Sequence, residues 1–245
     1  MDTIDAIERI EHDFAQRKPP FNDTQFPEER LLENLPAKSM EDKLKAISFF
    51  ATCDYNRNAS QLVGNLLQMH DRQPHFYDAY ENPPSENVIE TTMEHIGFRY
   101  PSRDAHGWFK NNEILRNEYN GKWSELVMSC SCDAPTLRSR LVEDGFLYLK
   151  GDKLAPMYAR IINDEVCPLS NLWELDIPTD VHIVRLTKDL ADTDLDTKDD
   201  VRRWWRNIAD DEGVNRHVVD GSLWLIGSNW DDWGEDYWNS VLSND

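Results

Sequence analysis

Two residues, Lys153 and Asp180, combine reactive side chains with positions at the starts of two predicted helices. Lys153 follows the polar break Leu149-Lys150-Gly151-Asp152, in which Asp152 is a residue type that caps helices. Partial burial and the positive end of its own helix favour a neutral amine, and a neutral amine is able to form a Schiff base. A carboxylate at the second helix start is suited to stabilising a developing positive charge.

The elements that must position these two residues are amphipathic helices. We expect Lys153 in the first turn of a helix whose buried face is marked by apolar residues at helical spacing, from Leu154 to Ile161. Pro178 disfavours helix at the residue before it, so the second helix starts near Asp180, with Val181 facing inward. The alternative interpretation is two capped core helices with a surface lysine, because charges at helix starts are commonly caps.

The first of these segments resembles the hairpin of the helix-hairpin-helix (HhH-GPD) DNA glycosylase superfamily. The family hairpin reads roughly L-P-G-x-G-x-K-x-A. Gly151 matches the second glycine, Lys153 the catalytic lysine and Ala155 the small residue that follows. Leu149 replaces the first glycine, so the phosphate grip of the hairpin differs in detail. The resemblance covers residues 146–186.

The second segment resembles the family element V-D-x-H-V-x-R. Asp180, His182 and Arg185 match its aspartate, histidine and arginine. The interval between the lysine and the aspartate is 180 − 153 = 27 residues, which is most similar to the archaeal 8-oxoguanine DNA glycosylase branch. The resemblance implies that Lys153 and Asp180 are the catalytic residues.

The resemblance implies a reaction on double-stranded DNA that contains a damaged base. The base leaves the stack, Lys153 attacks sugar C1′ to form a Schiff base, and Asp180 stabilises the oxocarbenium-like sugar. This is a bifunctional DNA N-glycosylase and AP lyase of base-excision repair, which uses no cofactor. We expect 8-oxoguanine as the first lesion to test.

The resemblance also implies a DNA-binding surface, in which Lys150, Gly151 and His182 hold phosphate and Arg185 is a further contact. The polar turn at residues 54–58 resembles the early turn that fills the gap left by the extruded base, which places Asn56 and Asn58 on DNA. The alternative is that this turn only caps the next helix. Most tryptophans of the tail belong in the core, and Trp224 and Trp230 are the candidates for stacking on the base.

Helical spacing dominates the chain, so we expect an all-α fold. Asp2 to Gln16 is amphipathic, and Ser39 to Asp42 carries a capping pattern. The resemblance implies one glycosylase unit over residues 1–245 with two helical lobes and the hairpin at their junction. We expect one lobe from residues 1–50 and 165–245 and the other from residues 51–164.

The composition is acidic for a DNA-binding protein. Asp and Glu number 46 against 26 Lys and Arg, which gives a formal net charge of −20. Nucleic-acid-binding proteins normally carry a basic surface. Either the chain does not bind DNA, or it belongs to the acidic proteome of a high-salt archaeal cytoplasm, where a local basic patch still binds DNA. Because salt weakens phosphate contacts, such an enzyme depends more on shape and stacking.

The four cysteines, Cys53, Cys130, Cys132 and Cys167, lack the spacing of zinc or iron–sulfur ligands, so we expect no metal. No apolar run reaches the length of about 18 residues that marks a membrane span. We therefore expect a reduced, monomeric, cytoplasmic protein. Two other functions stay open, namely a non-catalytic helix-hairpin-helix DNA-binding protein and a helical interaction protein without a DNA function.

Overall fold

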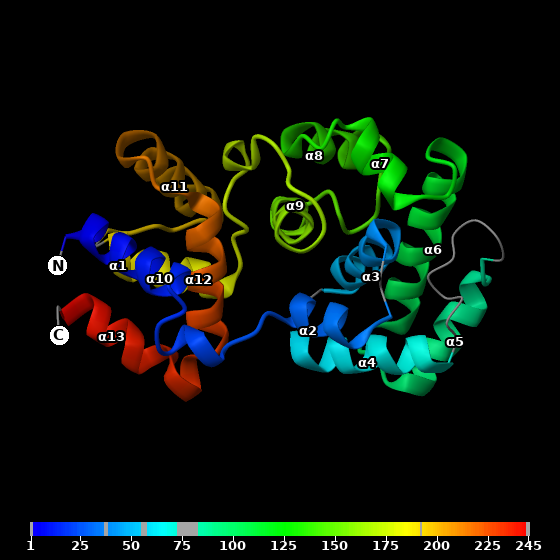
Figure 1. Cartoon of the computed structure of the whole chain (residues 1–245), viewed down its shortest axis with the longest axis horizontal. Coiled ribbons are helices and arrows are strands. Elements are labelled where there is room, and N and C mark those ends of the chain that lie inside the picture. The colour runs from blue at the N-terminus through cyan, green and yellow to red at the C-terminus, as the bar shows by residue number, and fades with distance from the viewer. Residues whose placement is uncertain (1, 37–38, 55–57, 73–82, 192, 244–245) are drawn as a thin grey trace. The chain divides into compact units, whose positions relative to one another are not determined.

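The computed structural model describes residues 2–36, 39–54, 58–72, 83–191 and 193–243. These residues form helices (Figure 1) and no strand. One isolated bridge joins Asp133 to Ser170. The all-α prediction is confirmed. None of the helices described has the length and apolarity that a bilayer crossing requires.

The chain divides into two compact units, each of which is described by itself. The middle unit, residues 26–172, contains α2 (Pro27–Asn34), α3 (Met40–Cys53), α4 (Ala59–Arg72), α5 (Glu86–Ile96), α6 (Pro101–Glu118), α7 (Trp123–Ser129), α8 (Ala134–Glu143) and α9 (Leu154–Glu165). The short turn η3 (Leu172–Glu174) lies at the boundary. The terminal unit, residues 1–25 and 173–245, contains α1 (Thr3–Ala15), η1 (Phe21–Asp23), α10 (Val181–Ala191), α11 (Lys198–Glu212), α12 (Arg216–Ser228), η4 (Trp230–Gly234) and α13 (Glu235–Ser243).

The unit boundaries differ from the expected lobes, which were divided near residues 50 and 164. Residues 26–50 join the middle unit because α3 packs against α6, α7 and α9. Residues 165–172 stay with that unit because Ser170 pairs with the backbone of Cys132 and Ala134. The sequence signals lie along single helices and do not show these contacts.

Helix ends follow the capping chemistry of the sequence at several places. Asp2 caps α1, and Ser39 and Asp42 form a reciprocal capping box at α3. Two expectations near the site were wrong. Asp152 does not cap α9 and instead pairs with Arg138 at 3.2 Å. Val181 does not face inward, since 72% of it is exposed.

An aromatic cluster fills the core of the middle unit. Trp108 of α6 and Trp123 of α7 stack with ring centroids 5.8 Å apart. Phe49 of α3 packs on Trp108 at 4.6 Å, and Phe146 and Tyr158 pack on Trp123 at 5.6 and 6.4 Å. Because Tyr158 belongs to α9 and Phe146 precedes it in the hairpin, this cluster fixes the helix that Lys153 begins.

Two buried tryptophans hold α10 in the terminal unit. Trp205 of α11 donates a hydrogen bond to Thr187 at 2.9 Å, and Trp238 of α13 donates to Asp189 at 3.1 Å. Helix α10 also packs against α12, which in turn packs against α1. These contacts hold the segment that follows Asp180 within its own unit.

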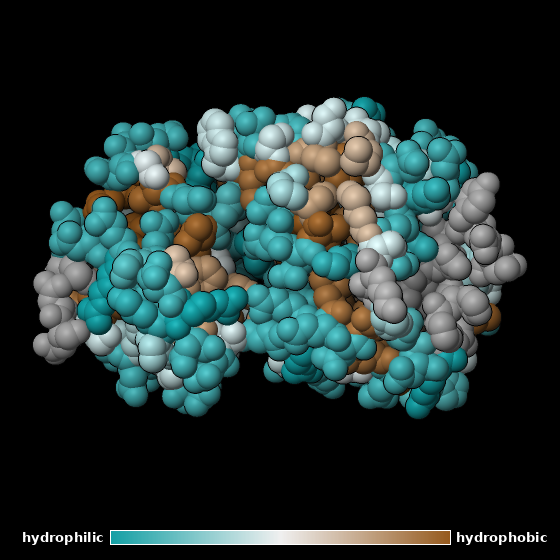
Figure 2. Space-filling view, in the orientation of Figure 1, coloured by the Kyte–Doolittle hydropathy of each residue, from teal (hydrophilic) through white to brown (hydrophobic). Residues whose placement is uncertain are grey.

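On the face seen in Figure 2, hydrophilic residues cover most of the surface of each unit.

A half-buried carboxyl group makes the stability of the middle unit depend on pH. Burial raises the pKa of Glu165, at the end of α9, from 4.5 to about 6, and the nearby carboxylates Glu29, Glu28 and Asp164 add to the effect. A raised pKa in the folded state means that the protonated form is favoured by folding. The contribution of Glu165 to stability is thus complete below pH 4.5 and is lost as the pH rises through about 6.

We predict that Glu165→Gln removes this loss. The variant should be no more stable than wild type at pH 4.5, and more stable by about 1 kcal/mol at pH 8, after allowing for solvent screening of a half-buried group. Urea unfolding at both pH values measures the difference. The exposed Glu118 at the end of α6 supplies a control. Glu118→Gln should leave the difference in unfolding free energy between pH 4.5 and pH 8 as it is in wild type. The prediction would be contradicted if the unfolding free energies of Glu165→Gln and wild type changed by the same amount between pH 4.5 and pH 8.

Candidate active site

The hairpin that leads to Lys153 joins α8 to α9 and turns at two left-handed residues. Gly145 has φ +80° and follows the end of α8, where Phe146 N donates to Leu141 O at 3.0 Å. Tyr148 has φ +63°, which is unusual for a residue with a side chain. Gly151, the glycine singled out in the sequence, does not have a left-handed backbone. The turn therefore differs from the one that the family glycines suggest.

One face of α6 holds the hairpin in place. Asn111 clamps the backbone of Leu147, because its Oδ1 accepts from Leu147 N at 2.7 Å and its Nδ2 donates to Leu147 O at 3.0 Å. One turn earlier, Gly107 leaves room for the Tyr148 ring, and the Arg103 guanidinium lies 3.7 Å from the centre of that ring. Residues 103, 107 and 111 share a face at a spacing of four. Sequence reasoning missed all three, since their spacing has meaning only once the hairpin is placed.

Lys153 occupies the N-cap position of α9 and not the first turn, where it was expected. Its Nζ lies 3.5 Å from Oδ2 of Asp54, the residue that follows α3. The lysine side chain is 35% exposed and that of Asp54 is 13% exposed. Helix α9 itself is buried from Ala155 to Ile162, so the base of the lysine is rigid and its amine is accessible.

Asp180 caps α10, the helix that the sequence predicted to start near this residue. Its Oδ1 accepts hydrogen bonds from the backbone N–H of His182 at 2.8 Å and of Ile183 at 3.0 Å. Among the residues that the structure describes, Oδ2 makes no hydrogen bond. Asp180 is partly exposed, so this second oxygen is oriented and available to a ligand.

The expected phosphate ligands of the hairpin are accessible. Lys150 and Gly151 are exposed, and a Cβ atom placed on Gly151 would meet nothing within 4 Å. Leu149, which replaces the first family glycine, is fully buried. Asn58 is exposed and caps α4 by accepting from Gln61 N at 3.0 Å, as the alternative interpretation of the polar turn required. Asn56 lies outside the described residues.

The remaining candidates gather on α10, α12 and η4. His182 packs against Gly227, where an added Cβ would lie 2.4 Å from the Cβ of His182. Arg185 donates to Gly227 O at 3.4 Å, and its guanidinium lies 3.9 Å from the centre of the Trp230 ring. Trp224 and Trp230 are half-buried. Arg185 and Trp230 thus contact each other within the terminal unit.

The sequence candidates are thus shared between the two units. The middle unit carries Lys153, Lys150, Gly151 and Asn58, and the terminal unit carries Asp180, His182, Arg185, Trp224 and Trp230. Within a unit, the structure joins Arg185 to Trp230 and joins Lys153 to Asp54, a contact that the sequence did not indicate.

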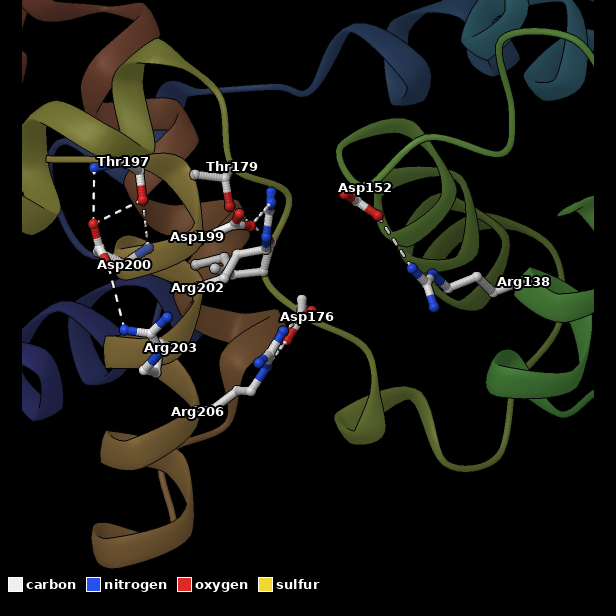
Figure 3. A network of polar contacts seen from close by, with 11 residues as sticks. Arg138, Asp152, Asp176, Thr179, Thr197, Asp199, Asp200, Arg202, Arg203 and Arg206 are labelled. Carbon is white, nitrogen blue, oxygen red and sulfur yellow. Dashed lines mark hydrogen bonds and ion pairs between the residues drawn. The ribbon is translucent and has the colours of Figure 1, made fainter. Parts of the chain in front are cut away.

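Arginines near these segments are paired with aspartates (Figure 3). In the terminal unit, Arg206 of α11 binds Asp176 through two hydrogen bonds of 2.5 and 2.7 Å. Arg202 and Arg203 of the same helix pair with Asp199 and Asp200. Each of the three arginines of α11 therefore has an aspartate partner within the terminal unit.

Within the described part of the chain, no group of three or more His, Cys, Asp or Glu residues is arranged to hold a metal ion. The four cysteines are free thiols.

A solved structure shares this fold. The crystal structure of the 8-oxoguanine DNA glycosylase of Thermotoga maritima matches over 91% of this chain and 96% of that chain, with a TM-score of 0.55 and 19% sequence identity. The likeness shows the helical DNA glycosylase fold that the hairpin resemblance implied. That protein is bacterial and lends no support to the archaeal branch suggested by the 27-residue interval. No protein family model and no curated protein matches the chain.

We predict that Gly107→Ala destabilises the middle unit. The new Cβ would lie 2.5 Å from the Tyr148 ring, which the Arg103 guanidinium covers. Overpacking of this kind costs about 1–3 kcal/mol. Gly64 of α4 is the matched control, because an added Cβ there meets nothing within 4 Å. Gly64→Ala should stabilise the protein by up to about 1 kcal/mol through helix propensity.

Chemical denaturation of the two variants and wild type measures both effects. Equal stabilities for Gly107→Ala and Gly64→Ala would show that the Tyr148 ring is free to move and that α6 does not set the hairpin.

Proposed function

We propose that the protein is a base-excision repair DNA glycosylase with AP lyase activity, and that 8-oxoguanine is its first candidate lesion. The observation that carries the proposal is the placement of Lys153 at the N-terminal end of a buried helix, directly after a hairpin, within a helical DNA glycosylase fold. The fold alone leaves the function open. The lysine and the aspartate give the reaction class.

Lys153 is the proposed nucleophile. Its helix is anchored by Tyr158 in the aromatic cluster, and the preceding hairpin is clamped by Asn111, so the amine projects from a rigid base. Attack of Nζ on sugar C1′ displaces the base and leaves a covalent Schiff base, from which strand cleavage proceeds. The amine can reach C1′ because the nucleotide has left the base stack.

Asp180 is the proposed stabiliser of the sugar cation. Two backbone N–H groups hold Oδ1, which fixes the direction of the carboxylate without blocking Oδ2. A preorganised negative charge lowers the energy of an oxocarbenium-like sugar, because the charge needs no reorientation during the reaction. The proposal assigns Lys153 and Asp180 to the same nucleotide.

Lys150 and Gly151 are the proposed phosphate ligands. Both are exposed on the hairpin, and the open space at Gly151 lets a phosphate approach the backbone N–H groups. Contacts of this kind position the duplex and do not read the base. His182, Arg185, Asn56 and Asn58 remain further proposed contacts, with Trp224 and Trp230 as proposed stacking partners for the base.

We predict that Lys153→Gln abolishes strand cleavage and borohydride trapping on a duplex with a single 8-oxoguanine, while DNA binding survives. Asp180→Asn keeps a cap acceptor for α10 but loses the charge, so base release should slow by roughly 10²- to 10³-fold. Single-turnover rates measure both variants. A panel of duplexes with one lesion each identifies the base. A Lys153→Gln protein that cleaves at the wild-type rate would place the nucleophile elsewhere.

Lys150→Gln supplies a second prediction on the same hairpin. Loss of one phosphate contact should weaken damaged and undamaged duplexes by the same factor and reduce the salt dependence of binding. Trapping at saturating protein should remain. Unequal losses for the two duplexes would mean that Lys150 reads the lesion.

Trapping by wild type but not by Lys153→Gln also excludes the two non-catalytic alternatives, a DNA-binding protein and an interaction protein.

A further inference from the structure

The ion pair between Lys153 and Asp54 places both charges at helix ends that disfavour them. Asp54 is the C-cap of α3, where unpaired carbonyl groups create a negative potential. Lys153 is the N-cap of α9, where unpaired N–H groups create a positive potential. The usual arrangement puts anions at helix starts and cations at helix ends. Stability does not explain this pair.

A second carboxylate makes the position of Asp54 still less favourable. Glu28 of α2 is buried, and burial is the main cause that raises its pKa, with the charge of Asp54 acting in the same direction. Glu28 is held by Arg160 of α9 at 3.0 Å. Asp54 is itself mostly buried and has Lys153 as its ion-pair partner at 3.5 Å. Residues whose charge opposes the local stability of the fold are candidates for a functional role.

We propose that Asp54 is the proton acceptor for Lys153, an inference that rests on the function proposed above. Before Nζ attacks, the ammonium group must give up a proton, and Asp54 Oδ2 is the carboxylate oxygen within ion-pair distance among the described residues. Asp180 then serves the sugar cation alone. The two tasks, removal of a proton and stabilisation of a cation, fall to two different aspartates.

The proton balance of the reaction closes with this assignment. One proton passes from Lys153 to Asp54, and the nitrogen lone pair forms a bond to C1′. The bond from C1′ to the base breaks, and its electron pair leaves with the base, which takes up the proton from Asp54. As the sugar ring opens, a second proton moves from nitrogen to the ring oxygen, and the third stays on the iminium. No oxidant or additional reactant is required.

Three other carboxylates of the neighbouring elements have arginine partners of their own. Asp152 of the hairpin pairs with Arg138 of α8. Arg160 holds both Glu28 and Asp164. Asp54 is thus distinguished from these groups by its position beside the amine.

The test uses a duplex with a preformed abasic site, so that base release is not needed, and measures borohydride trapping from pH 6 to pH 10. We expect Asp54→Asn to slow trapping at pH 7 by roughly 10²-fold, the size of a general-base contribution. The defect should shrink as the pH rises, because hydroxide then removes the proton. Asp54→Glu should retain most of the wild-type rate. Asp152→Asn is the matched control and should keep the wild-type profile.

Stability and chemical rescue separate catalysis from structure. Asp54→Asn should melt at the wild-type temperature or above it, because a charge leaves the negative end of α3. Formate should restore trapping to Asp54→Ala in proportion to its concentration.

A defect that is equal at every pH, or the absence of any defect, would overturn the role of Asp54 while leaving Lys153 as the nucleophile. If Asp54→Asn is unfolded, the pH dependence of the trapping rate of Asp54→Glu provides the test instead. A trapping rate that does not change with pH in Asp54→Glu would contradict the proposal. A wild-type protein that traps no abasic DNA would refute the proposed function itself and the assignment of Asp54 with it.

Discussion

The two hydrogen bonds between Asn111 and the backbone of Leu147 are the constraint on which the candidate site depends. They fix the middle of the hairpin against α6, so that Tyr148 can hold a left-handed backbone with its ring over Gly107. These backbone N–H and C=O groups are partly buried, and one amide side chain supplies a hydrogen-bond partner to both. The hairpin thereby delivers Lys153 to the start of a buried helix.

The site places charge where folding alone would not. Burial, helix dipoles and a neighbouring carboxylate all act against Asp54, and the N-terminal end of α9 acts against Lys153. Proteins accept such conflicts at functional sites and offset them elsewhere. Here the aromatic cluster around Trp123 supplies the packing that holds α9 in place.

Local chemistry could be predicted from the sequence, and contacts between distant segments could not. Periodicity and capping residues predicted the helical fold, and the start of α10 near Asp180 followed from the position of Pro178. The partners of the site escaped prediction because they come from elsewhere in the chain, Asp54 from α3 for Lys153 and Trp230 from η4 for Arg185. Charge pattern alone does not indicate which carboxylate meets which amine.

The most direct test of the account locates the covalent bond. Wild-type protein is trapped with borohydride on abasic DNA, digested with a protease, and the modified peptide is identified by mass spectrometry. The account predicts that the sugar remnant lies on the side-chain nitrogen of Lys153. A protease that cuts after lysine should then fail to cut after this residue. A remnant on any other lysine or on the N-terminal amine would contradict the central claim, namely that the hairpin exists to present this amine.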